Sequence, residues 1–147
     1  VQLTGYPLKQ LYKNLGKLPA TSITVILEAC FSGQSHSGHL SVRTSGISIQ
    51  PKMPNVPDRL TVISAGAANQ VASWEQDESQ SLFTKYFLKA MSGDGDRKPY
   101  GNGDGKVSLK ELKRYLDKEM TYLARRYYGR DQNAQITVDG RQVLVGN

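Results

Sequence analysis

The pattern of apolar positions predicts a helix and two strands in the first half of the chain. Leucine and tyrosine side chains recur at helical spacing over residues 8–15, between Pro7 and Gly16, and this predicts a short amphipathic helix. Residues 22–28 hold the large apolar side chains Ile23, Val25, Ile26 and Leu27, a concentration that is typical of a strand buried on both faces of a parallel sheet. A similar run at 60–65 predicts a second strand.

The second half of the chain predicts two longer helices followed by a hairpin. Apolar stripes at helical spacing run through 82–91 and through a helix that begins at Ser108. Short apolar runs at 136–138 and 143–145 predict a hairpin that turns at Asp139-Gly140. Because strands and helices alternate, the predicted fold class is α/β with a mainly parallel sheet.

Two segments show little periodicity and are predicted to be loops. Residues 34–59 are rich in serine, glycine and proline, and we interpret them as a mobile linker. Residues 94–105 form an acidic, glycine-rich loop. The full length of 147 residues, 38% of them hydrophobic, is enough for one globular domain with one core.

Composition and charge exclude several classes of protein. No apolar run approaches the roughly 20 residues of a membrane span. The single cysteine excludes an internal disulfide and a thiolate-rich zinc site, and it favours a reducing compartment such as the cytoplasm. The formal net charge is +6, with basic residues concentrated between 106 and 130. Such a face either binds nucleic acid through its phosphates or forms a solvated helix surface, and no nucleic-acid motif accompanies it.

Cys30 follows the first buried strand at once and precedes small, loop-forming residues. Open α/β sheets bind their ligands at the carboxyl ends of the strands, so this position suggests a nucleophile. The alternative is a structural role, because free cysteines are commonly buried as small hydrophobic residues.

The residues around Cys30 resemble a known family. Glu28-Ala-Cys30-Phe-Ser-Gly33 is similar to the Asp-Ala-Cys-Phe-Ser-Gly motif of metacaspases and bacterial caspase-like peptidases, with glutamate in place of aspartate. Further resemblances follow in the family's order at 60–74, 81–84 and 133–140. The resemblance implies a caspase-like three-layer sandwich, a mainly parallel sheet with helices on both faces. It also implies that residues 1–147 form only part of the peptidase domain.

For catalysis, the resemblance implies a thiolate at Cys30 that attacks a peptide carbonyl, with the backbone N–H of Cys30 donating to the oxyanion. The family's partner histidine lies about 50 residues upstream of the cysteine, but only 29 residues precede Cys30 and none is histidine. A missing N-terminal part of the domain supplies the histidine, or His36 or His39 replaces it. We favour the first explanation, which predicts that this chain alone is inactive.

The resemblance also points to a substrate pocket. The candidate substrate-binding residues are Glu28, Ser64, Gln70, Trp74, Glu75 and Asp77. Metacaspase-like sequences carry an Asp-Asp pair before the glutamine that matches Gln70, whereas this chain has Ala68-Asn69. The acidic residues at 75, 77 and 78 either replace that pair and favour a basic substrate side chain, or simply form a solvated loop and acidic helix start.

A segment in the second loop resembles most of an EF-hand calcium site. The candidate ligands, at loop positions 3, 5, 7, 9 and 12, are Asn102, Asp104, Lys106, Ser108 and Glu111, with Gly105 at position 6. Tyr100 occupies position 1, where calcium requires an oxygen ligand, so Asp94 or Asp96 would have to loop back. A capping box between Ser108 and Glu111 explains both residues without a metal.

Together these features predict a cysteine endopeptidase that needs no cofactor and acts on protein or peptide substrates, away from membranes. The alternative is a catalytically inactive caspase-like module that binds protein partners and responds to calcium. Nucleic-acid binding through residues 106–130 is a third hypothesis.

Overall fold

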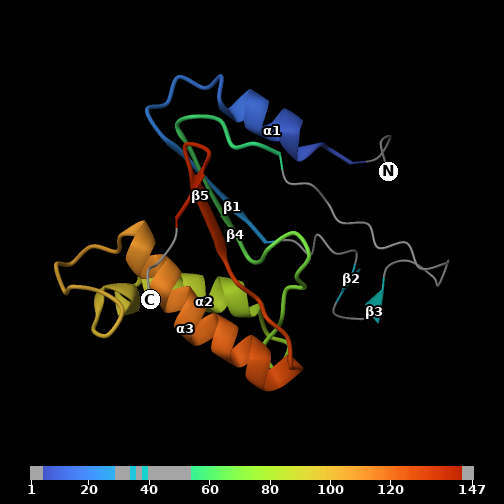
Figure 1. Cartoon of the computed structure of the whole chain (residues 1–147), viewed down its shortest axis with the longest axis vertical. Coiled ribbons are helices and arrows are strands. Elements are labelled where there is room, and N and C mark those ends of the chain that lie inside the picture. The colour runs from blue at the N-terminus through green and yellow to red at the C-terminus, as the bar shows by residue number, and fades with distance from the viewer. Residues whose placement is uncertain (1–4, 29–33, 36–37, 40–53, 144–147) are drawn as a thin grey trace.

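The computed structural model describes residues 5–28, 34–35, 38–39 and 54–143 (Figure 1). Its elements in chain order are α1 (Leu8–Leu15), β1 (Ile23–Leu27), β2 (Gln34–Ser35), β3 (Gly38–His39), β4 (Leu60–Ser64), α2 (Leu82–Met91), the 3₁₀ turn η1 (Asp94–Asp96), α3 (Leu109–Tyr128), β5 (Gln135–Val138) and β6 (Arg141–Gln142). The predicted helices and the first two strands are confirmed to within one or two residues at their starts and ends, except that α3 extends five residues beyond Leu123, where its predicted apolar stripe ends.

The main sheet has the strand order β1-β4-β5-β6 and is mixed rather than mainly parallel. β1 and β4 are parallel, with Ile26 opposite Ile63, whereas β5 runs antiparallel to both β4 and β6. The β5–β6 pair is antiparallel because β5 turns directly into β6. Asp139 and Gly140 both have positive φ, at 46° and 74°, as a two-residue hairpin turn requires. For this reason β6 begins at residue 141, earlier than the predicted strand at 143.

Helices cover both faces of this sheet, which confirms the predicted three-layer arrangement (Figure 1). On one face, Tyr12 of α1 packs with Leu60 and Val62 of β4. On the other face, Ile63 and Ile136 join the core that α2 and α3 form. Because successive side chains of a strand point to opposite faces, neighbouring residues of β4 contribute to two different cores.

The expectation that the first strand is buried on both faces is wrong. Residues 23, 25 and 27 of β1 pack toward α1, but Thr24 and Ile26 are exposed, Ile26 to 49%. Among the described residues, β1 pairs with β4 and has no partner on its other side. An apolar run therefore identified the strand correctly but did not reveal its position at the edge of the sheet.

Of the segment predicted as a linker, residues 34–35, 38–39 and 54–59 are described. β2 and β3 form a short antiparallel pair in which Gln34 lies opposite His39, and the remainder of the segment lies outside the described residues. Within the described ranges, no helix is long and apolar enough to span a membrane.

Candidate substrate pocket at the end of strand β1

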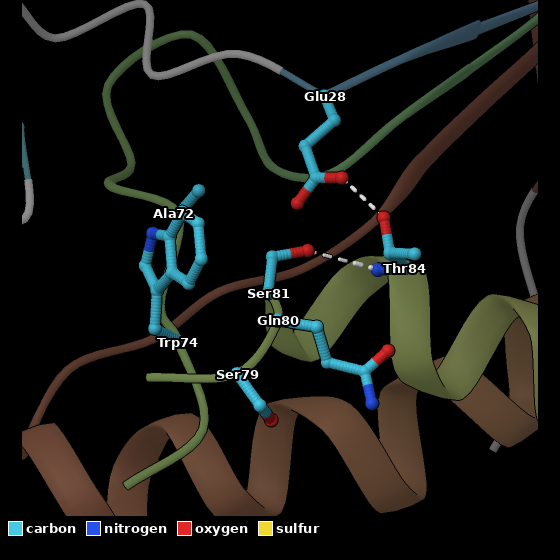
Figure 2. Close-up of a pocket in the computed structure, with 7 residues that line it drawn as sticks. All are labelled: Glu28, Ala72, Trp74, Ser79, Gln80, Ser81 and Thr84. Carbon is cyan, nitrogen blue, oxygen red and sulfur yellow. Dashed lines mark hydrogen bonds between the residues drawn. The ribbon is translucent and has the colours of Figure 1, made fainter. Parts of the chain in front are cut away.

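A cavity of about 450 Å³ opens where β1 ends and α2 begins. Its lining residues are Glu28, Ala72, Trp74, Ser79, Gln80, Ser81 and Thr84. They come from the end of β1, from the loop after β4 and from the first turn of α2. Figure 2 shows the Glu28 carboxylate pointing from the strand toward Thr84 and Ser81, with the indole of Trp74 on the other side. The described part of the lining thus combines one carboxylate, one large aromatic side chain and several uncharged polar groups.

The start of α2 fixes the polar side of this pocket. Ser81 is the N-cap of the helix, and its hydroxyl oxygen accepts a hydrogen bond of 3.0 Å from the backbone N–H of Thr84. The hydroxyl of Thr84 in turn donates to the carboxylate of Glu28. A local helix-capping pattern therefore orients the side chain of Glu28, which directly follows β1 and lies 56 residues earlier in the chain.

The aromatic side of the pocket depends on the loop after β4. Trp74 forms an isolated antiparallel bridge with Ser81, and the carbonyl of Ser73 accepts a hydrogen bond of 2.9 Å from the N–H of Leu82. These backbone contacts place the loop against the start of α2. Trp74 lines the cavity, as the sequence predicts for a pocket wall.

Ser64 and Gln70 contact backbone groups near the pocket rather than the cavity itself. Ser64 is buried at the end of β4, where its hydroxyl lies 3.2 Å from the carbonyl oxygen of Gly66. The side-chain oxygen of Gln70 accepts hydrogen bonds from the N–H groups of Ala67 and Asn133, at 3.0 and 2.9 Å. Gln70 thus connects the loop after β4 to the segment that leads into β5.

Glu75 and Asp77 do not line the cavity. Glu75 is buried, and the Lys85 ammonium lies 2.8 Å from its Oε1 atom. This ion pair is also the main reason that the pKa of Lys85 is raised. Asp77 is exposed and accepts hydrogen bonds from the hydroxyl and the N–H of Ser79, which lower its pKa. Of the three predicted carboxylates, only Glu28 lines the pocket.

Five lining residues were not predicted, namely Ala72, Ser79, Gln80, Ser81 and Thr84. A signal for the last two was present in the sequence. A serine three residues before a threonine at the start of an apolar stripe is typical of a helix N-cap, and it indicates that both side chains gather at one helix end. The small and polar residues at 72, 79 and 80 carry no pattern that distinguishes them from an ordinary loop.

Cys30 lies outside the described residues, as does His36. His39 belongs to β3. The structure therefore describes the chain up to Glu28, two residues before the predicted nucleophile. What the described residues establish is the pocket that lies beside that point of the chain.

The segment predicted as a calcium loop is organised by its own hydrogen bonds. Asp96 is buried, and its carboxylate accepts hydrogen bonds from the N–H groups of residues 103, 104 and 105. Asp96 thus does loop back toward the predicted ligands, although Tyr100 stands at the first position of the motif. The hydroxyl of Tyr100 donates a hydrogen bond to Glu119, and this contact raises the pKa of Tyr100 to about 12.

The remaining predicted ligands also contact one another. Ser108 and Glu111 form the predicted capping box, and Glu111 also accepts a hydrogen bond of 3.0 Å from the N–H of Asn102. Asp104 accepts a hydrogen bond from the N–H of Lys106. In the described part of the chain, no three histidine, cysteine, aspartate or glutamate side chains are grouped so that they would hold a metal ion. Calcium binding here stays a prediction.

Comparison with known proteins gives one match. The family model described as the caspase domain matches residues 4–142 of the chain. No curated protein and no solved structure matches it.

Proposed function

The chain belongs to the caspase-domain family, and on this premise we propose that it is the part of a cysteine endopeptidase that carries the nucleophile and one wall of the substrate pocket. Cys30 is the proposed nucleophile. The observation that carries this proposal is the cavity at the end of β1, because the chain leaves Glu28 of that cavity and reaches Cys30 two residues later. Two residues of chain span at most about 7 Å.

The proposed reaction is acyl transfer to the cysteine followed by hydrolysis. The thiolate of Cys30 attacks the carbonyl carbon of the scissile peptide bond, and backbone N–H groups donate to the oxyanion that forms. The carbon–nitrogen bond then breaks as the departing amine takes a proton from the histidine partner. Water, deprotonated by the same histidine, hydrolyses the acyl-enzyme and restores the thiol.

The contents of the pocket favour a substrate with a long basic side chain. Among the described residues that line the cavity, Glu28 offers the only carboxylate, and Trp74 offers a large apolar surface beside it. A lysine or arginine side chain fits both, because its aliphatic stem packs on the indole while its charged end pairs with the carboxylate. An acidic substrate side chain would instead face Glu28 at close range and be repelled.

The histidine partner is proposed to come from a further segment of the same protein that packs beside β1. The edge of β1 and the exposed Ile26 support this, since an apolar strand edge is rarely left open in a folded protein. Leu88 and Met91, one and two turns beyond Thr84 on α2, are exposed as well, to 55% and 50%. Such a segment would cover these side chains and bring a base toward Cys30.

The experiment that tests the proposal uses the complete protein and its Cys30→Ala variant. We expect the unaltered protein to cleave a peptide with a central arginine and the variant to lose this activity. Iodoacetamide should react with Cys30 faster than with a model thiol at neutral pH, because the histidine stabilises the thiolate.

The competing candidate, an inactive module that binds protein partners, predicts a different outcome. In that case the complete protein cleaves nothing and Cys30 reacts no faster than a model thiol. Activity that survives the Cys30→Ala substitution would contradict both candidates, because it would require another nucleophile.

A further inference from the structure

We propose that Tyr128 and Gln132 are positioning residues that hold Trp74 in the pocket wall, and that they set the affinity for substrate rather than the rate of the chemical step. The inference deepens the proposed function, on which its kinetic part rests. Neither residue lines the cavity. Both belong to the end of α3 and the segment leading to β5, more than 50 residues from the loop that they contact.

Gln132 connects the start of the loop after β4, at Ala65, to the middle of that loop, at Ser73. Its side chain is fully buried. The Oε1 atom accepts a hydrogen bond of 2.7 Å from the N–H of Ser73, and the Nε2 group donates one of 3.0 Å to the carbonyl of Ala65. One amide therefore satisfies a backbone donor just before Trp74 and a backbone acceptor at the end of the preceding strand. Because the whole arrangement is buried, losing either bond leaves a backbone group without a partner.

Tyr128 acts directly on the residue that forms the wall. Its hydroxyl donates a hydrogen bond of 2.9 Å to the backbone carbonyl oxygen of Trp74. The Arg130 guanidinium lies over the Tyr128 ring, 5.0 Å from its centre, and it also approaches the carbonyl of Ala72 at 3.4 Å. The last turn of α3 and the residues after it thus fix the carbonyl of Trp74 and support the preceding residues of the loop.

These contacts reach the pocket through the backbone. The direction of a carbonyl sets the plane of its peptide group, and with it the direction in which the side chain leaves the chain. Trp74 has a cavity-lining side chain, yet the hydrogen bond that orients its carbonyl comes from Tyr128, which does not line the cavity. Ala72, which Arg130 approaches, also lines the cavity. Breaking the hydrogen bonds of Tyr128 and Gln132 therefore displaces Trp74 without removing any group that touches substrate. We call these two residues and their hydrogen bonds to the loop the frame of Trp74.

The test uses Tyr128→Phe, which removes only the hydroxyl, with Tyr127→Phe as the matched control. Tyr127 is the neighbouring half-buried tyrosine, and its hydroxyl forms no hydrogen bond within the described ranges. The readout is the fluorescence of Trp74, the sole tryptophan of the printed sequence. Each protein is measured against its own Trp74→Phe counterpart, which isolates the signal of this residue.

We expect Tyr128→Phe to shift the emission of Trp74 and to increase its quenching by acrylamide, with an unchanged far-ultraviolet circular dichroism spectrum. Tyr127→Phe should leave both properties of Trp74 unchanged. Gln132→Met should give a larger effect in the same direction. Identical quenching in the Tyr128→Phe protein and the unaltered protein would overturn the proposal, whatever the stability of the Gln132 variant.

The kinetic readout uses the complete, active protein. We expect Tyr128→Phe to raise KM for an arginine peptide about three- to tenfold, as expected for one hydrogen bond, and to leave kcat within about twofold. A fall in kcat at constant KM would overturn the proposal that Tyr128 sets the affinity for substrate. If the complete protein shows no Cys30-dependent hydrolysis, the proposed function fails, and the fluorescence of Trp74 still decides whether the frame exists.

Discussion

The hydroxyl of Thr84 donates a hydrogen bond to the carboxylate of Glu28, which joins the first turn of α2 to the end of β1. This contact links the polar side of the pocket to the strand that leads to Cys30. It also fixes the one carboxylate that the described residues contribute to the pocket.

Replacing Thr84 by valine tests the importance of this contact. The variant keeps the shape of the side chain but leaves the Glu28 carboxylate without its donor, so it can rotate away from the position that meets a substrate cation. We expect KM for an arginine peptide to rise about two- to fivefold in the complete protein. Thr84→Ser should restore the unaltered value, and a serine variant that behaves like valine would point to packing instead.

Replacing Glu28 by glutamine should have a larger effect. It removes the charge from the pocket and with it a charge-assisted hydrogen bond to a basic side chain, so we expect KM to rise about tenfold or more. Asp77→Asn is the matched control, since Asp77 is acidic and lies in the loop beside the lining residue Ser79 but does not itself line the cavity. Equal effects of the two substitutions would show that general acidity, rather than the position of Glu28, attracts the substrate.

The N-cap of α3 allows a prediction about stability. Ser108 accepts a hydrogen bond from the N–H of Glu111, and the reciprocal bond of the capping box is also present. Ser108→Ala should therefore lower the free energy of unfolding by about 1 kcal/mol in urea titrations. Lys110→Ala, an exposed change in the first turn of the same helix, should lower it by much less. A variant as stable as the unaltered protein would indicate that the loop holds this helix end without the cap.

Acid should weaken the same helix end. Hydrogen bonds from the N–H and hydroxyl of Ser108 lower the pKa of Glu111 below its usual 4.5. A carboxyl group with a lowered pKa stabilises the fold above its unfolded-state pKa, and this contribution is lost as the pH falls through the folded-state value. Unfolding in urea between pH 7 and pH 3 should show a loss of stability below about pH 4.5. The loss should be smaller in Glu111→Gln, and equal losses in both proteins would contradict this assignment.

The sequence predicted those parts of the molecule that local patterns determine. The stripe through residues 82–91 and the capping box at Ser108 specify their helices without help from distant residues. Asp139-Gly140 likewise specifies a tight turn, and it forms one. Even so, β6 begins earlier than the apolar run predicts. The turn contains only two residues, so Arg141 already pairs with Val138 of β5.

Features that depend on distant contacts were not predictable in the same way. From the sequence, Glu75 and Asp77 were as plausible as Glu28 as acidic residues of the pocket. In the structure, however, Glu75 forms an ion pair with Lys85, and Asp77 accepts a hydrogen bond from Ser79. The role of Gln132 could not be predicted from the neighbouring sequence, since its hydrogen-bond partners are backbone groups about 60 residues away. The exposed side of β1 was equally hidden, because an apolar run does not show which strands lie beside it.

We propose above all that the protein is a cysteine peptidase whose pocket selects a basic side chain through Glu28. The most direct measurement compares cleavage of two peptides by the complete protein, identical except for arginine or aspartate at the cleavage site. We expect that the arginine peptide is cleaved, that the aspartate peptide is not, and that Cys30→Ala abolishes the cleavage. Preferential cleavage of the aspartate peptide, or cleavage that persists without Cys30, would contradict it.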